Sequence, residues 1–346
     1  MSFNLNKKQA LAGFALLCLS AAVGTASAAT VALPQTTTTG FGLTEWRTYN
    51  IGADGASAPF SGGCDGGAGL HMLDARGPTG AGDAYDGAWQ IYVNGASFVA
   101  PGGNVDLTGT TLTAGPVPMS GLQVSVQYYF STPSAVARIL VTMNNPSAAA
   151  IVATVEVPVN YGSDSGTVIR ATSSGDTLVT TADRWVVSSD SGPSDPVNTV
   201  VFYGPGAPRV TPATYTQTVF NCAATNGLGA TFSVSVPAGA TRSLMFFAGL
   251  GGVTVNDNLI ASAQTAAALF NSNSTLRAEW LSGMTGIQQS QVVNWSLFTS
   301  CAAEGFTGSQ LTMCRQVCEV NQTPTTLTGL IKLYTAIYRT APPCAR

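Results

Sequence analysis

Charged side chains and histidine are scarce in this chain. Asp, Glu, Lys and Arg make up 9% of its 346 residues, and His71 is its single histidine. The lysines are Lys7, Lys8 and Lys332, and basic residues form no cluster. Nucleic-acid binding relies on clustered Lys and Arg that displace phosphate counterions. The composition therefore argues against nucleic acid as a partner.

Long apolar runs are missing beyond the N-terminal region. The longest, Leu244 to Val253, spans ten residues and contains three glycines. A helix needs about 20 apolar residues to cross a bilayer. We therefore expect no transmembrane span in the mature chain.

The first 28 residues have the pattern of an export signal. Lys7 and Lys8 precede an apolar stretch from Ala10 to Val23, and Ala26-Ser27-Ala28 is a small-x-small cleavage site. We predict a signal peptide at 1–28 and a mature protein that is periplasmic or extracellular. Its 12 basic and 17 acidic residues would leave it weakly acidic.

Short strands separated by Gly and Pro fill most of the chain. Apolar and polar residues alternate from Leu122 to Phe130, which is the period of a half-buried strand. Strands at 135–143 and 151–159 follow after short turns, and we expect an antiparallel meander of the three. Many short strands without intervening helices predict a sandwich or barrel. Further strands are expected at 88–93, 184–188, 197–203, 215–220, 230–236 and 241–248.

The pattern changes to helical near residue 256. Asn256-Asp-Asn258 can cap an Ala-rich helix over 259–270. Further helices are expected around Trp280, over 286–295, around Cys314 and Cys318, and up to about Thr340. The predicted fold is mainly β: a large antiparallel β-sandwich, then a small disulfide-stapled helical region. The expected divisions are a Thr-rich extended or mobile lead-in at 29–40, a β-sandwich domain at 41–255, a helical segment packed on it at 256–300, and a cysteine-containing helical hairpin tail at 301–346.

Six cysteines remain after removal of the signal. An even number in an exported chain with one histidine predicts disulfides and no bound metal. Cys314 and Cys318 lie one helical turn apart, where a mutual bridge would be strained. We favour 314–344 with 301–318, and the competing arrangement is 301–314 with 318–344. The remaining pair would join two distant β loops; the six are Cys64, Cys222, Cys301, Cys314, Cys318 and Cys344.

Aspartates are spread through a glycine-rich stretch that also holds His71. Asp65, Asp74, Asp83 and Asp86 offer the oxygen ligands that Ca²⁺ needs, and a Ca²⁺ site near Asp83 and Asp86 is one interpretation. The other interpretation is ordinary turn chemistry. No other cofactor is expected. Because no Gly-x-Ser-x-Gly nucleophile motif accompanies His71, a structural role for this histidine is favoured over catalysis.

The densest group of polar and aromatic residues lies between Asn160 and Asp190. Paired carboxylates suit glycoside hydrolysis, and Trp and Tyr rings stack on sugars. The alternative is that the aspartates shape turns, the arginines pair with them, and the tryptophan belongs to the core. The candidate ligand-binding residues are Tyr161, Asp164, Arg170, Asp176, Asp183 and Trp185.

Three motifs in this region carry a resemblance. Asn160-Tyr-Gly-Ser-Asp-Ser-Gly166, Ala171-Thr-Ser-Ser-Gly-Asp176 and Thr181-Ala-Asp-Arg-Trp-Val-Val187 resemble a pattern in secreted bacterial proteins with a galactose-mutarotase-like β-supersandwich. The resemblance covers roughly residues 85–295. It implies a β-supersandwich fold and secretion. The catalytic histidines and glutamate of true mutarotases have no matching motif. Residues 314–344 resemble a short cysteine-bearing C-terminal module of other exported bacterial proteins.

The function we favour is that of a secreted, non-enzymatic binding or surface-structural protein that recognises a glycan or another cell-surface component. The alternative is a polysaccharide-active enzyme, a lyase or hydrolase, that uses carboxylates and Arg on the sandwich face. A third class is a subunit of a larger assembly that docks through the helical tail. No oligomeric state is predicted.

Overall fold

The computed structural model describes residues 28–51, 69–192, 194–206, 208–219, 227–253, 257–271, 276, 278–297, 301–302, 306–320, 324–339 and 342. Nearly all of the predicted signal peptide lies outside these residues. So do Asp65, Cys64, Cys222 and Cys344. The bridge predicted between Cys64 and Cys222 and the competing bridge of Cys344 to Cys318 therefore stay predictions.

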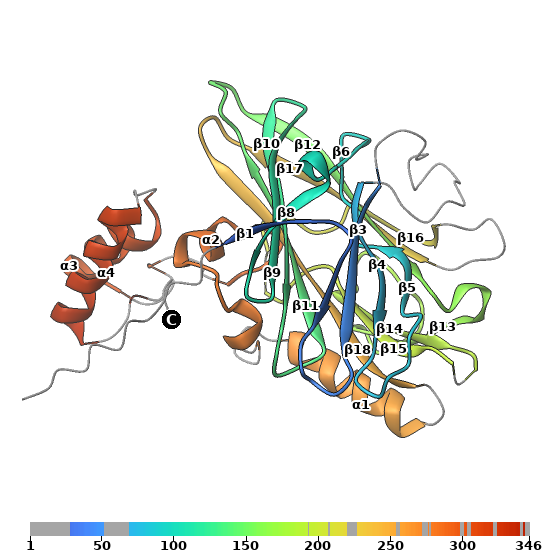
Figure 1. Ribbon diagram of the computed structural model, residues 1–346. Coiled ribbons are helices and arrows are strands. Elements are labelled where there is room, and N and C mark those ends of the chain that lie inside the picture. Colours follow the sequence, from blue (N-terminus) through green and yellow to red (C-terminus); the bar gives the residue numbers. More distant parts are fainter. Residues whose placement is uncertain are drawn as a thin grey trace, which may run out of the picture.

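Two large antiparallel sheets form the body of the protein (Figure 1). The first sheet has the strand order β1 (Ala29–Ala32), β8 (Asn104–Thr108), β9 (Thr111–Met119), β10 (Leu122–Phe130), β11 (Val136–Asn144), β18 (Thr241–Val253), β15 (Pro196–Val201), β14 (Trp185–Asp190) and β13 (Thr167–Thr172). The second has the order β16 (Thr214–Val219), β17 (Gly227–Val236), β12 (Ile151–Tyr161), β5 (Tyr85–Ala88), β4 (Gly69–Arg76), β3 (Glu45–Ile51) and β2 (Gln35–Thr38), with β6 (Tyr92–Val93) and β7 (Ala96–Ser97) beside β12. The predicted β-sandwich is confirmed.

The core lies between the two sheets. It is built from the side chains that point inward from every second residue of the strands. In β10 every second residue is buried, as the alternation predicted. Aromatic rings join the layers: Trp46 of β3 stacks on Phe130 of β10 at 5.4 Å, and Phe232 of β17 lies 5.5 Å from Phe246 of β18. Such ring pairs add to the free energy gained from burial alone.

The predicted meander of three strands is wrong in its third strand. β10 and β11 pair, but β12 belongs to the second sheet and pairs with β17. The buried side chain of Asn145 explains the crossing. Its Nδ2 donates to the carbonyl oxygens of Ala149, Val236 and Pro237, and so holds the connection against the end of β17.

The Thr-rich lead-in is extended, which was one of the two expectations for it. β1 pairs with β8 in the first sheet, and β2 pairs with β3 in the second. The segment therefore crosses from one sheet to the other and contributes a strand to each.

Helical elements cover the outer face of the first sheet. Helix α1 (Asp257–Ala268) packs on β14, β15 and β18, and is followed by the 3-10 turns η4 (Leu269–Asn271) and η5 (Ala278–Leu281) and by α2 (Gly286–Gln291). The helix expected around Trp280 is a single 3-10 turn, and α2 ends earlier than predicted. Asn294 explains this end: its side chain bonds Met245 N, Met245 O and Phe202 O, so the chain there is extended against β18.

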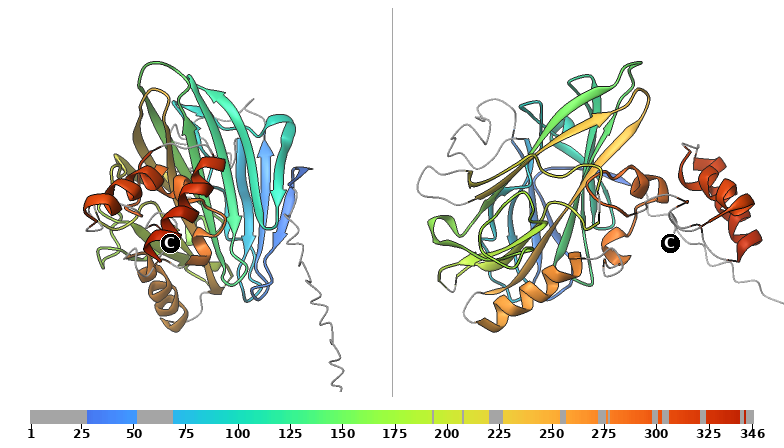
Figure 2. Two further views of the ribbon diagram at one scale, coloured as in Figure 1. Left: turned by 90° about the vertical axis from the view of Figure 1, so that its left-hand side faces the viewer. Right: turned by 180° about the vertical axis from the view of Figure 1, so that it is seen from behind.

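The tail consists of α3 (Gly308–Cys318) and α4 (Pro324–Tyr338), which pack through Val317, Leu327 and Tyr334. Figure 2 shows both helices to one side of the sheets. A disulfide joins Cys301 to Cys314, and Cys318 is also disulfide-bonded. In the described part of the chain, no helix is long and apolar enough to span a bilayer.

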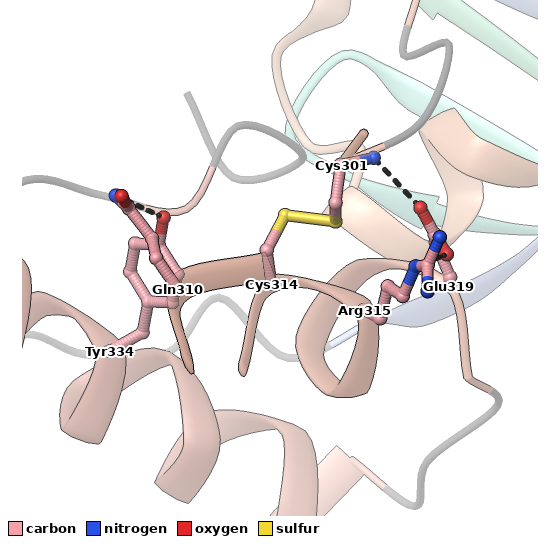
Figure 3. The surroundings of a disulfide bond; sticks show 6 residues. All are labelled: Cys301, Gln310, Cys314, Arg315, Glu319 and Tyr334. Carbon is pink, nitrogen blue, oxygen red and sulfur yellow. Dashed lines mark hydrogen bonds and ion pairs between the residues drawn. A yellow bond between two sulfur atoms is a disulfide. The ribbon is translucent and has the colours of Figure 1, made fainter. Parts of the chain in front are cut away.

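The favoured arrangement, 301–318 with 314–344, is therefore wrong in both bonds, and the competing 301–314 bond is present. The amide of Cys301 donates to Glu319 Oε1 at 2.7 Å, which fixes residue 301 against α3 (Figure 3). The sulfurs of Cys301, Cys314 and Cys318 all lie within 4.8 Å of one another. Spacing along the helix could not decide which of the two neighbouring sulfurs Cys301 reaches.

Candidate functional site

Three of the predicted ligand-binding residues lie in or beside the loop between β13 and β14. Asp183 is fully buried, and its carboxylate accepts hydrogen bonds from the amides of Ser174 and Thr180 at 3.0 and 2.9 Å. Burial acts to raise the pKa of Asp183, but these bonds outweigh it and the pKa is lowered. Asp176 Oδ1 accepts from Thr172 Oγ1 and Leu178 N. Both carboxylates hold the loop in shape.

Trp185 is also part of this loop's support. Its indole N–H donates to Asn271 Oδ1 at 2.8 Å, and its ring belongs to the apolar cluster between the first sheet and α1. The ring of Trp185 therefore lies in an apolar core, as the alternative interpretation expected. A ligand role for Asp176, Asp183 and Trp185 stays a prediction.

Of the other three predicted residues, Asp164 belongs to a cluster of carboxylates that we term the acidic junction, Arg170 bonds the main-chain oxygen of Asp190 in that cluster, and Tyr161 ends the strand just before it. Three parts of the chain supply it: β4 with the β4–β5 hairpin and β5, the turn after β12, and the β14–β15 hairpin. Electrostatic interactions connect their carboxyl groups across these segments. The members are Asp74, Asp83, Asp86, Asp164, Asp190 and Asp195.

Two glycines let the turn after β12 lie between the two hairpins. A Cβ on Gly162 would lie 2.2 Å from the carbonyl oxygen of Asp83, and a Cβ on Gly166 would lie 2.4 Å from Asp190 Oδ1. The backbone also connects them: Gly162 N donates to Ala84 O, and Ser191 N donates to Gly166 O. The motif from Asn160 to Gly166 is thus the centre of the junction.

The carboxyl groups of the junction have different proton affinities. Burial, followed by the charges of Asp83, Asp164 and Asp74 and a hydrogen bond with Asp164, raises the pKa of Asp86 to about 6. Burial, followed by the charges of Asp190 and Asp83, raises the pKa of Asp195 to about 6. Perturbed pKa values of this kind concentrate at functional sites.

The pKa values of Asp83 and Asp190 are shifted in opposite directions. Burial and the charges of Asp74 and Asp164 raise the pKa of Asp83. Burial also acts to raise the pKa of Asp190, but hydrogen bonds from Ser194, Gly192 and Ser191 outweigh it and the pKa is lowered. The junction thus combines a carboxylate that stays ionised with neighbours that take up protons at mildly acidic pH.

Positive charge offsets the junction weakly. Arg47 bonds Glu45 at 2.9 Å and Asp74 at 3.4 Å. Arg170 donates to Ser189 Oγ and to the main-chain oxygen of Asp190, and not to its carboxylate. Asp83, Asp86 and Asp164 are exposed at the surface. The junction therefore offers an accessible group of carboxylates with net negative charge.

Two buried amide oxygens lie beside this group. Asn160 and Asn198 are 4% and 1% exposed, and their Nδ2 atoms donate to the carbonyl oxygens of Asp86 and Ala84. Neither Oδ1 has a hydrogen-bond partner among the described residues. Buried polar atoms are normally paired, so these two oxygens are exceptions beside the carboxylates.

Tyr161 and His71 are both inside the protein. The Tyr161 side chain is fully buried and lines a cavity of about 140 Å³ beneath the turn. His71 is fully buried, its Nδ1 lies 3.0 Å from Gly69 O, and burial lowers its pKa. This placement agrees with the structural role favoured for the histidine.

Sequence reasoning did not select Asp190, Asp195 and Asn198 as site residues. Their signal was weak but present, because the two aspartates bracket a Ser- and Gly-containing turn between predicted strands. These residues come close to Asp83 and Asp164 because the two sheets pack together. The local sequence pattern does not reveal this packing.

Comparisons with known proteins give structural neighbours without sequence relatives. No protein-family model and no curated protein sequence matches the chain. A solved galactose mutarotase-like protein from Lactobacillus casei is 8% identical with a TM-score of 0.34, over 65% of this chain and 100% of that one. A galactose mutarotase related enzyme from Lactobacillus acidophilus is 9% identical with a TM-score of 0.31, over 66% and 98%.

A polysaccharide lyase is a third neighbour. It is 8% identical with a TM-score of 0.35, over 56% of this chain, and the match spans 32% of the lyase's own length. Galactose mutarotase-like proteins, which the Asn160–Val187 motifs resemble, are thus among the structural neighbours. At these TM-scores neither activity nor ligand is transferred from them.

Proposed function

We propose that this protein is an exported, non-enzymatic binding protein that recognises a cell-surface glycan at the acidic junction. The supporting observation is the gathering of carboxylates from three parts of the chain around the Gly162–Gly166 turn, where Asp83, Asp86 and Asp164 are exposed. Ionised carboxylates accept several hydrogen bonds, and adjacent sugar hydroxyls supply such donors. In this proposal Asp164 and Arg170 contact the ligand and Tyr161 supports the turn from below.

Ca²⁺ is the cofactor of this proposal. The excess of carboxylates and the unpaired oxygens of Asn160 and Asn198 give the oxygen-rich surroundings that Ca²⁺ favours. A bound cation would offset the repulsion between Asp83, Asp86 and Asp164, and it could also bind sugar hydroxyls.

One observation favours the enzyme as a second candidate. Asp86 has a pKa of about 6 and shares a hydrogen bond with Asp164. Glycoside hydrolysis also uses two carboxyl groups of which one, the general acid, has a raised pKa, but it needs them about 5 Å or more apart, so a substrate would have to separate this pair. Exposure of both groups at the surface, and not in a cavity, favours binding over catalysis: no carboxylate lines the cavities of about 400, 540 and 140 Å³ in the described part of the chain.

The test is retention of the mature protein on a panel of immobilised acidic and neutral polysaccharides, with Ca²⁺ or with a chelator. New reducing or unsaturated ends are measured in parallel. Retention that needs Ca²⁺, without new chain ends, supports the proposal. New ends at about pH 5 to 6 that disappear in Asp86→Asn support the enzyme instead. Absence of retention on every polysaccharide contradicts the binding proposal.

A further inference from the structure

A second candidate site is a cavity of about 400 Å³ between α1, the outer face of the first sheet and two loops of the second sheet. Its floor includes Thr199 of β15 and Gly249 of β18, and Ala263 of α1 forms one side. Phe41 and Pro78, from loops of the second sheet, form its rim. A largely apolar hollow of this size falls within the range of small-molecule binding sites.

The cavity exists because small residues face each other across it. Gly249 and Gly251 of β18 have no side chains to extend from the sheet toward α1, and α1 presents Ala263 and Ala267 there. The neighbouring residues of β18 on the same face, Met245 and Phe247, fill the equivalent space with large side chains. The glycines thus end the packed region and leave an open volume.

Aromatic side chains wall this volume. The rings of Phe270 and Trp280 stack at 4.6 Å, and Trp280 Nε1 donates to Ser134 Oγ at 3.0 Å. Both rings are almost completely buried, so they are held in place before any ligand arrives. Phe41, which also lines the cavity, is 40% exposed. Exposed aromatic rings beside an apolar hollow mark binding sites.

The chemistry of the lining restricts the occupant. None of the described lining residues carries a charge, and the polar atoms come from hydroxyl groups such as those of Ser134, Thr199 and Ser262. A charged ligand would lose hydration without gaining a partner. Aromatic rings prefer offset or edge-on contact with other rings, which Phe41, Phe270 and Trp280 can provide.

We propose that this cavity binds a small uncharged aromatic molecule, with its ring between Phe41 and the Phe270–Trp280 pair. A hydroxyl group on the ring would reach Ser134 or Thr199. The volume equals that of roughly a dozen water molecules in the liquid, which suits a compound of one to three rings. The site is separate from the acidic junction, since no carboxylate lines it.

The test is a fluorescence titration of the mature protein with N-phenyl-1-naphthylamine, an uncharged aromatic probe. Ala266 lines the cavity and is exposed, so Ala266→Phe would fill the opening without changing the buried core. Ala261 is exposed on the same helix and does not line the cavity, so Ala261→Phe is the matched control. We expect saturable binding that weakens about tenfold or more in Ala266→Phe and is unchanged in Ala261→Phe.

Two further arms complete the test. Phe41→Ser removes the rim ring from an exposed position and should weaken probe binding several-fold. 1-Naphthol should displace the probe, and lauric acid should not. No saturable signal in the wild type, equal affinity in Ala266→Phe, or equal displacement by lauric acid would overturn the proposal, the last by showing an acyl-chain site.

Discussion

The guanidinium of Arg138 donates a hydrogen bond of 2.8 Å to the main-chain oxygen of Trp280, 142 residues later in the chain. Its Nη1 also donates to Ser282 O, and its Nη2 donates to Gln127 Oε1. Arg138 is 1% exposed and lies over the Tyr129 ring. Burial lowers its pKa to about 10. One buried cation therefore fastens the helical segment to the β body.

Replacing this arginine should destabilise the protein. Arg138→Met keeps an apolar stem but leaves the carbonyls of Trp280 and Ser282 without their donor, which we expect to cost about 1–3 kcal/mol of the free energy of unfolding. Urea unfolding followed by circular dichroism measures it. Arg315→Met removes an exposed pair with Glu319 and should change that free energy by about 0–1 kcal/mol. An equal decrease in the free energy of unfolding in both variants would show that the buried hydrogen bonds to residues 280 and 282 stabilise the protein no more than the exposed ion pair does.

Ionisation of the carboxyl groups in the acidic junction should destabilise the folded protein as pH rises. Because the pKa values of Asp86 and Asp195 are raised from 3.8 to about 6, the folded protein binds more protons than the unfolded chain between these values. The free energy of unfolding should therefore fall as pH increases from about 4 to 6. The buried His71, with its lowered pKa, acts in the opposite direction below 6.5. A comparison of variants separates the two effects.

The double variant Asp86→Asn with Asp195→Asn keeps His71 unchanged. It should unfold at a higher temperature than the wild type near pH 7.5, and the difference should vanish near pH 4. Asp106→Asn, at an exposed carboxylate of β8 toward the opposite end of the first sheet, is the control for the loss of a surface carboxylate. A wild type that is more stable than the double variant at neutral pH would mean that these carboxylates are stabilising and that the repulsion is absent.

The turn after β12 should not tolerate a side chain at Gly162. A Cβ there would lie 2.2 Å from the backbone oxygen of Asp83, so Gly162→Ala must push the two segments apart. We expect a loss of about 1–3 kcal/mol, as for other overpacked sites. Gly82→Ala is the matched control, because a Cβ at Gly82 meets nothing within 4 Å. If thermal unfolding shows the same midpoint for both variants, the turn is not held between the hairpins as described.

The strands were predictable where their pattern is local. The alternation from Leu122 to Phe130 gave both ends of β10, and the caps and apolar spacing gave α1, α3 and α4 closely. The sheet of β12 was not predictable, because it depends on Asn145 reaching the end of β17. Residues 292–295 were predicted as helix, but Asn294 bonds the backbone of β18 and keeps them extended.

The site was predictable in part for the same reason. Asp83, Asp86, Asp164 and Arg170 were chosen from two separate motifs, and the structure brings them to one junction. Asp190 and Asp195 join them only through the packing of the two sheets, which leaves no mark on local sequence. Asp176 and Asp183 were chosen for their density in the sequence, and they bond their own loop.

The Cys301–Cys314 bond should order the tail and leave the β body independent of it. It closes a loop with a sequence separation of 13, for which about 3 kcal/mol of stabilisation is expected. Cys301→Ser with Cys314→Ser should therefore make α3 and α4 sensitive to protease while β1 to β18 stay resistant. Limited proteolysis with mass spectrometry shows which segment is cut first. A tail as resistant as in the wild type would mean that packing around Tyr334 is sufficient.

The binding affinity of Asp164→Asn tests the central claim most directly. Affinity electrophoresis against a polysaccharide that retains the wild type compares this variant with the wild type and with Asp106→Asn. Asp164 is exposed at the centre of the junction, and Asp106 is exposed on β8, far from it in the sheet order. We predict about tenfold weaker binding for Asp164→Asn and a change below about twofold for Asp106→Asn. Equal affinity of all three proteins would contradict the acidic junction as the glycan site.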